Sequence, residues 1–306
     1  MPSIVFMGTP DFAIASMNAI HNEFGLTAVV TLPDKPSGRG QQIKPTPVKS
    51  AASALHIPVL TPTSLKDPEF IKALSALKPD IICVVAFRIL PKEVYSIARL
   101  GAFNIHGSIL PKYRGAAPVQ WAIINGEKVS GVTSFLLNDI VDTGNIIDTR
   151  KIDITNQMTA GELFDALTPL GAELAVSTCK ELLAGNVTPH MQDDSLASPA
   201  PKLYREQCHV HFDKSALNIK NFIHGVNPRP GAWCIFNSKT LKLLKAEIVE
   251  GNNIQQAHFE IQKDNFLIGC NTGTISITVL QEEGKPAMKT EDFLRGYRGP
   301  HSGVLE

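Results

Sequence analysis

Cysteine is scarce in this chain of 306 residues, and its spacing excludes two kinds of protein. The five cysteines are scattered, and none forms a Cys-x-x-Cys pair: Cys83, Cys179, Cys208, Cys234 and Cys270. A disulfide framework needs pairs, and a thiolate zinc site needs closely spaced thiols, so neither is indicated. We expect buried, reduced thiols, no bound metal and a cytoplasmic protein.

The chain also lacks an excess of charge of either sign, and it has no long apolar run. Lys and Arg number 29 and Asp and Glu number 29, so an RNA contact would depend on a local patch. No run reaches the length of a membrane span, and Met1-Pro2-Ser3 leads straight into a strand. We therefore expect neither a membrane association nor a signal peptide. The 43% hydrophobic content allows a sizeable core, and the length allows two domains.

The complete Gly-x-Gly-x-x-Gly fingerprint is absent, although Gly8-Thr9-Pro10 follows an apolar strand. A dinucleotide site is therefore rejected. Buried apolar strands nevertheless alternate with helices expected at 10–22, 49–55 and 68–77, the last capped by Asp67. The expected strands are residues 4–7, 26–32, 58–60, 80–87 and 101–106. This alternation predicts a Rossmann-like, doubly wound, mostly parallel sheet, which binds ligands at the carboxyl ends of its strands.

The character of the chain changes after a linker-like stretch at 193–201. Before it we expect a helix at 117–125, a hairpin of strands at 131–137 and 146–152, and a long helix at 159–183. After it come short strands with Gly and Asn turns, at 233–236, 240–248, 266–270 and 274–280. This pattern is typical of a small OB-like β-barrel. We expect domains at residues 1–200 and 201–306.

Asn104 and His106 are the first candidate catalytic residues. They stand two apart at the end of a strand, so their side chains share a face. An amide and an imidazole N–H together suit an oxyanion that forms when a nucleophile attacks a carbonyl. Alone, such a pair matches by accident more often than not.

Two further features are ambiguous when taken singly. Asp142 lies in an Asp-Thr-Gly turn, where a carboxylate near His106 would orient the imidazole and favour its charged form. By itself the motif is simply a turn. Residues 33–49 form a long Pro/Gly-rich loop with four basic residues and one acid, either a solvated loop or an arm that docks on phosphates.

Taken together, these motifs resemble the methionyl-tRNA formyltransferase family. The resemblance covers nearly the whole N-terminal domain. Its motifs are residues 4–10, the loop at 33–49, Asn-Ile-His-Gly-Ser-Ile-Leu-Pro at 104–111, Arg-Gly-Ala-Ala-Pro-Val-Gln at 114–120 and Asp142-Thr143-Gly144. It implies transfer of a formyl group from 10-formyltetrahydrofolate to the amino group of methionyl initiator tRNA, with no metal.

The resemblance also implies roles for individual residues. Asn104 and a protonated His106 would donate to the formyl oxygen, while Asp142 would hold His106 and help to take the amine proton. The folate pocket would be lined by Ser108, Ile109, Leu110, Pro111, Ala86 and Phe87. The tRNA would meet Arg39, Lys35 and Lys44 and the C-terminal barrel. We expect a monomer.

Some positions depart from the commoner family pattern. Arg88 stands where many members have Gly, residues 138–141 replace Asp-x-Gly-Leu, and Trp121 stands where a basic residue is frequent. Two other enzymes share the catalytic constellation, namely a sugar-nucleotide or glycinamide-ribonucleotide formyltransferase and a formyltetrahydrofolate hydrolase. The basic loop and the β-rich C-terminal region favour tRNA over a small acceptor. An RNA-binding protein with a degenerate enzyme domain is disfavoured, because all three chemical residues are present.

Overall fold

The computed structural model describes residues 1–37 and 42–306, which divide into two compact units. Unit 1 comprises Met1–Pro118, Ser130–Ile152 and Phe164–Ala200, and unit 2 comprises Val119–Val129, Asp153–Leu163 and Pro201–Glu306. Residues 201–306 therefore share their unit with two short segments of the first 200 residues. The division into functional domains at residue 200 stays a prediction.

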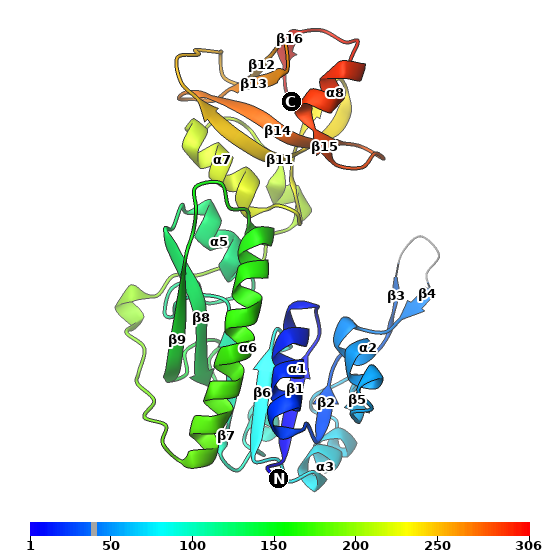
Figure 1. The fold of residues 1–306 in the computed structure, drawn as a ribbon, viewed down its shortest axis with the longest axis vertical. Coiled ribbons are helices and arrows are strands. Elements are labelled where there is room, and N and C mark those ends of the chain that lie inside the picture. Colours follow the sequence, from blue (N-terminus) through cyan, green and yellow to red (C-terminus); the bar gives the residue numbers. More distant parts are fainter. Residues whose placement is uncertain (38–41) are drawn as a thin grey trace. The chain divides into compact units, whose positions relative to one another are not determined.

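A seven-stranded sheet in the order β5-β2-β1-β6-β7-β8-β9 organises unit 1 (Figure 1). Its strands are β1 (Ile4–Gly8), β2 (Ala28–Val30), β5 (Val59–Leu60), β6 (Ile81–Val85), β7 (Gly101–His106), β8 (Val129–Leu136) and β9 (Ile146–Asp153). The first five in spatial order pair in parallel, and β8 pairs antiparallel with β7. The predicted mostly parallel sheet is confirmed.

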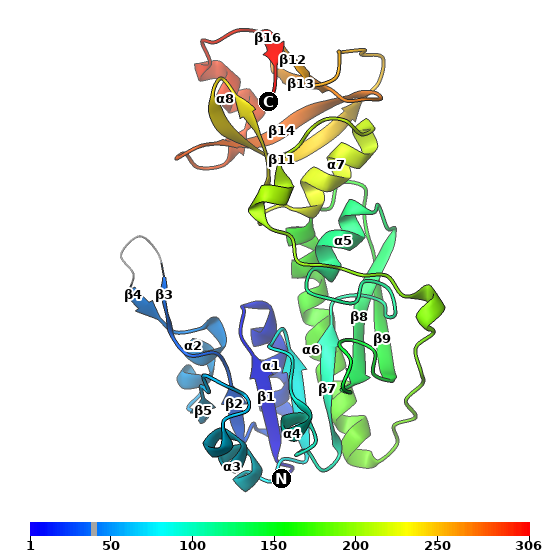
Figure 2. The ribbon, with the colours of Figure 1, turned by 180° about the vertical axis from the view of Figure 1, so that it is seen from behind.

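Helices cover both faces of this sheet because its central strands are apolar on both sides. Figure 1 shows α1 and α6 over one face, and Figure 2 shows α4 on the other. The α4 face has a core in which Val5, Ile82 and Ala102 pack with Leu74 and Val94. The helices of unit 1 are α1 (Phe12–Phe24), α2 (Pro47–Ala54), α3 (Pro68–Ala76), α4 (Lys92–Tyr95) and most of α6 (Ala160–Ala184), whereas α5 (Pro118–Ile124) belongs to unit 2 apart from its first residue.

Local capping fixes where several of these helices begin. The Asp67 side chain accepts a hydrogen bond from the Glu69 N–H, with Pro68 in the first turn of α3. Thr46 caps α2 in the same manner, through Lys49 N–H. Both ends satisfy backbone donors that the helix leaves unpaired. The expected cap at Asp67 is confirmed.

The stretch predicted as a loop at 33–49 contains two short strands, so that prediction is wrong in part. β3 (Lys35–Ser37) pairs antiparallel with β4 (Gln42–Lys44), and Lys35 stands opposite Lys44. The proline and glycine content of the stretch indicated a loop. The strands form because residues 35–37 pair with residues 42–44, which the local composition does not indicate. Arg39 lies outside the described residues.

Unit 2 has an antiparallel sheet in the order β10-β11-β14-β13-β12-β16, with β15 paired to β14. The strands are β10 (Ala232–Phe236), β11 (Lys239–Val249), β12 (His258–Gln262), β13 (Asn265–Gly269), β14 (Thr274–Glu282), β15 (Met288–Lys289) and β16 (Ser302–Val304), with helices α7 (Ala216–Gly225) and α8 (Thr290–Gly296). A bulge in β11 lets the sheet curl around Phe236, Phe259 and Phe266. The OB-like character expected of this region is confirmed.

Candidate active site

Asn104 and His106 both lie on β7, between the parallel strand β6 and the antiparallel strand β8. His106 is buried with 6% of its surface exposed, and its ring packs edge-on against Phe135. The Oδ1 atom of Asn104 is buried and has no hydrogen-bond partner among the described residues. A buried polar atom without a partner carries a desolvation cost, which a bound ligand can relieve.

The two ring nitrogens of His106 have different surroundings. Nε2 lies 2.8 Å from the carbonyl oxygen of Tyr113, which can only accept, so this nitrogen carries a proton. Nδ1 lies 3.8 Å from Oδ2 of Asp142. The structure therefore brings together His106 and a carboxylate 36 positions later in the chain. The imidazole and the carboxylate form an ion pair when Nδ1 also carries a proton.

Asp142 is held in a tight turn between β8 and β9. Its φ of 57° lies in the left-handed region, and its Oδ2 accepts a 2.8 Å hydrogen bond from the Gly115 N–H. A side chain on Gly144 would collide with the Leu136 carbonyl, and one on Gly115 would lie 2.6 Å from the Ala200 carbonyl oxygen. These close approaches explain the glycines of the Asp-Thr-Gly and Arg-Gly motifs.

Two polar residues that the sequence did not single out as site residues support this turn. The Nε2 atom of Gln192 donates to the carbonyl oxygens of Asp142 and Gly144. Its Oε1 accepts from Arg114, which also pairs with Asp194. Gln192 lies about 50 residues from the turn that it holds. No local pattern in the sequence marks such a contact.

A small cleft of about 80 Å³ adjoins these residues. Asn104, Asp142 and Phe87 line it, together with Val84, Arg88, Ile89, Leu90, Phe135, Leu137, Asn138, Asp139, Ile140 and Val141. It shares Arg88, Ile89, Leu90 and Asp139 with a wider cleft of about 540 Å³. Their combined size suits an elongated small molecule with one end near Asn104.

Arg88, one of the departures from the family pattern, stands where the two clefts meet. Its guanidinium donates to the carbonyl oxygens of Pro62 and Thr63 and lies over the Phe87 ring, 5.4 Å from its centroid. Burial lowers the pKa of this side chain. Arg88 thus fastens the loop after β6 to the segment before α3.

The remaining residues expected at the folate site lie around the end of β7. The Ser108 hydroxyl donates to the Lys112 carbonyl, and Leu110 packs against Phe135 and Ile146. Thr133 Oγ1 bridges the segment to β8, donating to the Ser108 carbonyl and accepting from the Leu110 N–H. Ala86 adopts a left-handed φ of 48° just before Phe87. Of the six residues, Phe87 alone lines the small cleft.

The described residues contain neither a candidate metal site nor a membrane-spanning helix. Within residues 1–37 and 42–306, no three His, Cys, Asp or Glu side chains are grouped so that they could hold a metal ion. None of the helices in those ranges is both long and apolar enough to cross a bilayer.

Comparison with known proteins agrees with this fold. Residues 1–179 match the family model described as formyl transferase, and residues 202–298 match that of the formyl transferase C-terminal domain. Two solved structures share the fold. An N-formyltransferase from Helicobacter canadensis has a TM-score of 0.70 at 23% identity, covering 92% of this chain and 100% of its own. The sugar 3N-formyl transferase WlaRD has a TM-score of 0.68 at 22% identity, covering 94% and 99%. These matches define the chain as a formyl transferase with the N-terminal and C-terminal regions of that class.

Curated relatives narrow the class. A methionyl-tRNA formyltransferase from Chlorobium limicola is 45% identical over 305 residues, which is 96% of this chain and 96% of the relative. The enzyme of that name from Macrococcus caseolyticus is 40% identical, covering 99% and 98%. The chain therefore belongs to the methionyl-tRNA formyltransferase family.

Proposed function

We propose that Asn104, His106 and Asp142 carry the reaction of this family in the present chain. The reaction transfers the formyl group of 10-formyltetrahydrofolate to the amino group of methionyl initiator tRNA. The observation that carries the assignment is the cleft in which Asn104 and Asp142 both stand, with His106 Nδ1 facing the Asp142 carboxylate.

Asn104 is the proposed donor to the formyl oxygen. Negative charge grows on that oxygen as the methionyl amine attacks the formyl carbon, and a fixed amide N–H stabilises it. The amide of Asn104 is half-buried and lines the cleft, so its N–H groups can reach a bound formyl group. Such a donor lowers the barrier by roughly 3 kcal/mol.

His106 and Asp142 are the proposed proton acceptors. The attacking amine forms a C–N bond with the formyl carbon and loses a proton, and the bond from that carbon to N10 of the folate breaks as N10 takes up a proton. Asp142 is the carboxylate nearest to His106 Nδ1, so the pair can receive the first proton and supply the second. His106 Nε2 is engaged by the Tyr113 carbonyl. Donation from this nitrogen to the formyl oxygen, as the resemblance implies, requires that hydrogen bond to be exchanged.

The donor substrate is assigned to the two joined clefts. Arg88 lines both clefts and Phe87 lines the smaller one, and ligand sites of comparable size are largely preformed in enzymes. Ala86 and residues 108–111 are proposed to shape the wall, since the turn after β7 is braced by Thr133 and Phe135.

The acceptor tRNA is assigned to the β3–β4 arm and to the C-terminal region. Lys35 and Lys44 stand opposite each other on that arm with exposed side chains, which suits contact with phosphates. Arg39 belongs to the same proposal on the strength of the family resemblance. We further propose that residues 1–200 form the catalytic domain and residues 201–306 the tRNA-binding domain. The proposed protein is a monomer located in the cytoplasm.

A formyl-transfer assay tests these assignments. The protein is mixed with 10-formyltetrahydrofolate and methionyl initiator tRNA at a fixed salt concentration, because phosphate contacts depend strongly on salt. We expect salt-sensitive formylation and a loss of about 100-fold in Asn104→Ala. His106→Ala and Asp142→Asn should also lose most of their turnover, while the exposed Asp165→Asn on α6 serves as the matched control.

Three results would contradict the proposal. Near-normal turnover in His106→Ala would remove the catalytic assignment. Transfer to a sugar or ribonucleotide amine in place of the tRNA would keep the site and discard the acceptor. Folate hydrolysis without any acceptor would indicate a hydrolase.

A further inference from the structure

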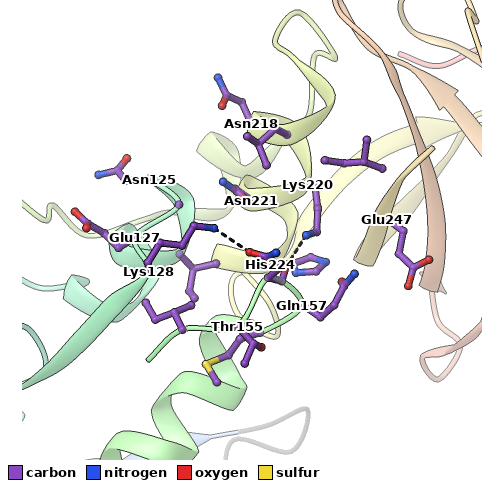
Figure 3. A pocket seen from close by; sticks show the side chains of 17 residues that line it. Asn125, Glu127, Lys128, Thr155, Gln157, Asn218, Lys220, Asn221, His224 and Glu247 are labelled. Atoms are coloured by element: carbon purple, nitrogen blue, oxygen red, sulfur yellow. Dashed lines mark hydrogen bonds between the residues drawn. The ribbon is translucent and has the colours of Figure 1, made fainter. Parts of the chain in front are cut away.

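A second cavity, of about 610 Å³, lies wholly within unit 2 and contains none of the residues proposed for formyl transfer. It is bounded by the end of α5, the turn between α5 and β8, the loop at 154–158, α7 and β11 (Figure 3). Its lining is Ile123, Asn125, Gly126, Glu127, Lys128, Ile154, Thr155, Asn156, Gln157, Met158, Leu217, Asn218, Lys220, Asn221, His224, Glu247 and Ile248. The volume is within the range of small-molecule sites.

Two ammonium groups converge on one residue of this cavity. Lys128 Nζ donates to Asn156 Oδ1 at 2.9 Å, and Lys220 Nζ donates to the Asn156 carbonyl oxygen. Figure 3 shows the Lys128 and Lys220 side chains reaching toward each other, the first from the turn before β8 and the second from α7. Only 6% of the Lys220 surface is exposed. Lysine is seldom buried to this extent unless its charge is matched.

The surroundings do not neutralise this pair in full. Burial, and then the charge of Lys128, lower the pKa of Lys220, and Glu247 opposes them more weakly. Figure 3 shows the Glu247 carboxylate directed away from Lys220. His224 adds no charge near neutral pH, because burial and Lys220 lower its pKa to about 4. An anion between the two lysines would relieve both desolvation and mutual repulsion.

We propose that this cavity binds a phosphorylated ligand of nucleotide size, with its phosphate between Lys128 and Lys220. Lysine acts as a point charge toward phosphate, and each ammonium has N–H groups beyond the one that Asn156 receives. The amides of Gln157 and Asn221 offer donors and acceptors to the rest of the ligand. Ile123, Leu217 and Ile248 provide apolar surface for a ring. The phosphate belongs either to a free nucleotide or to an RNA backbone.

Titration calorimetry on the full-length protein tests the site with three probes: inorganic phosphate, adenosine monophosphate and a short single-stranded RNA. We expect saturable binding of the monophosphate. Lys128→Glu should weaken this binding by about tenfold or more, since the substitution replaces a positively charged donor by a carboxylate that repels the phosphate. Asn218 lines the cavity and is exposed, so it accepts substitutions of either charge. Asn218→Asp should weaken binding of the monophosphate, and Asn218→Lys should tighten it. Lys239→Ala, an exposed lysine outside the cavity, is the matched control.

The outcomes separate clearly. Binding of RNA alone, lost in Lys128→Glu, would support the phosphate site with a backbone as its source. Absence of saturable binding to all three probes, or equal affinity in the wild type, Lys128→Glu and both Asn218 variants, would overturn the proposal. Lys220→Met probes the buried lysine directly. If that variant fails to fold, Lys128 and Asn218, both exposed, still decide the question.

Discussion

The side-chain amide of Gln192 holds the turn that presents Asp142. Its Nε2 donates to the carbonyl oxygens of Asp142 at 2.9 Å and Gly144 at 2.8 Å. Asp142 has a left-handed φ of 57°, which is costly for a residue with a side chain and persists only when its surroundings enforce it. Arg114, bonded to Gln192 Oε1, follows the Tyr113 whose carbonyl engages His106. The Gln192 side chain thus contacts both the turn that holds Asp142 and the residue that follows the partner of His106.

Gln192→Ala should therefore lower kcat for formyl transfer by about tenfold, because a small misplacement of a catalytic group costs roughly this or more. The KM for methionyl initiator tRNA should change little, since Gln192 is assigned no contact with the tRNA. Steady-state kinetics with saturating folate donor measures both values. Met191→Ala, an exposed neighbour in the chain, is the control. Unchanged kcat in Gln192→Ala would show that the turn needs no such support.

The regular elements could be predicted from the sequence because their determinants are local. Continuous apolar runs gave β1, β6 and β7, and the Asp67-Pro68 pair marked the start of α3. β12 and β16 were missed, since they depend on pairing with distant segments rather than on a strong pattern of their own. β3 and β4 were not predicted, because the proline and glycine around them indicated a loop.

The proposed active site shows the same division. Asn104 and His106 share a face of one strand, which their spacing alone predicts. The approach of Asp142 to within 3.8 Å of His106 could be anticipated only from the family resemblance, because tertiary packing brings the turn there. Gln192 and the cavity around Asn156 depend on contacts between remote segments, so residue patterns did not indicate them.

The five cysteines should be inert toward thiol reagents in the folded protein. All five are buried, and burial raises the pKa of each thiol, to about 12 for Cys179 and Cys234 and about 11 for Cys270. The thiolate is the reactive form, so both its scarcity and its inaccessibility slow the reaction. Iodoacetamide at pH 8, followed by mass spectrometry, should add no label to the native protein and five after denaturation. Rapid native labelling at any one position would contradict this packing.

His224 should make folding stability depend on pH between about 4 and 6.5. Burial, with the nearby charge of Lys220, lowers its pKa from 6.5 to about 4, and its ring is engaged by the Ala246 backbone. As pH falls through this window, the unfolded chain takes up a proton that the folded chain does not, so the free energy of unfolding decreases. The full shift corresponds to a loss of about 3 kcal/mol at most. Urea unfolding at pH 7.0, 5.5 and 4.5 should show this decline in the wild type and in His211→Gln, whose histidine is exposed. His224→Gln removes the titrating group, so its stability should fall less steeply over the same range. An equal slope in His224→Gln and the wild type would mean that other groups control the acid sensitivity.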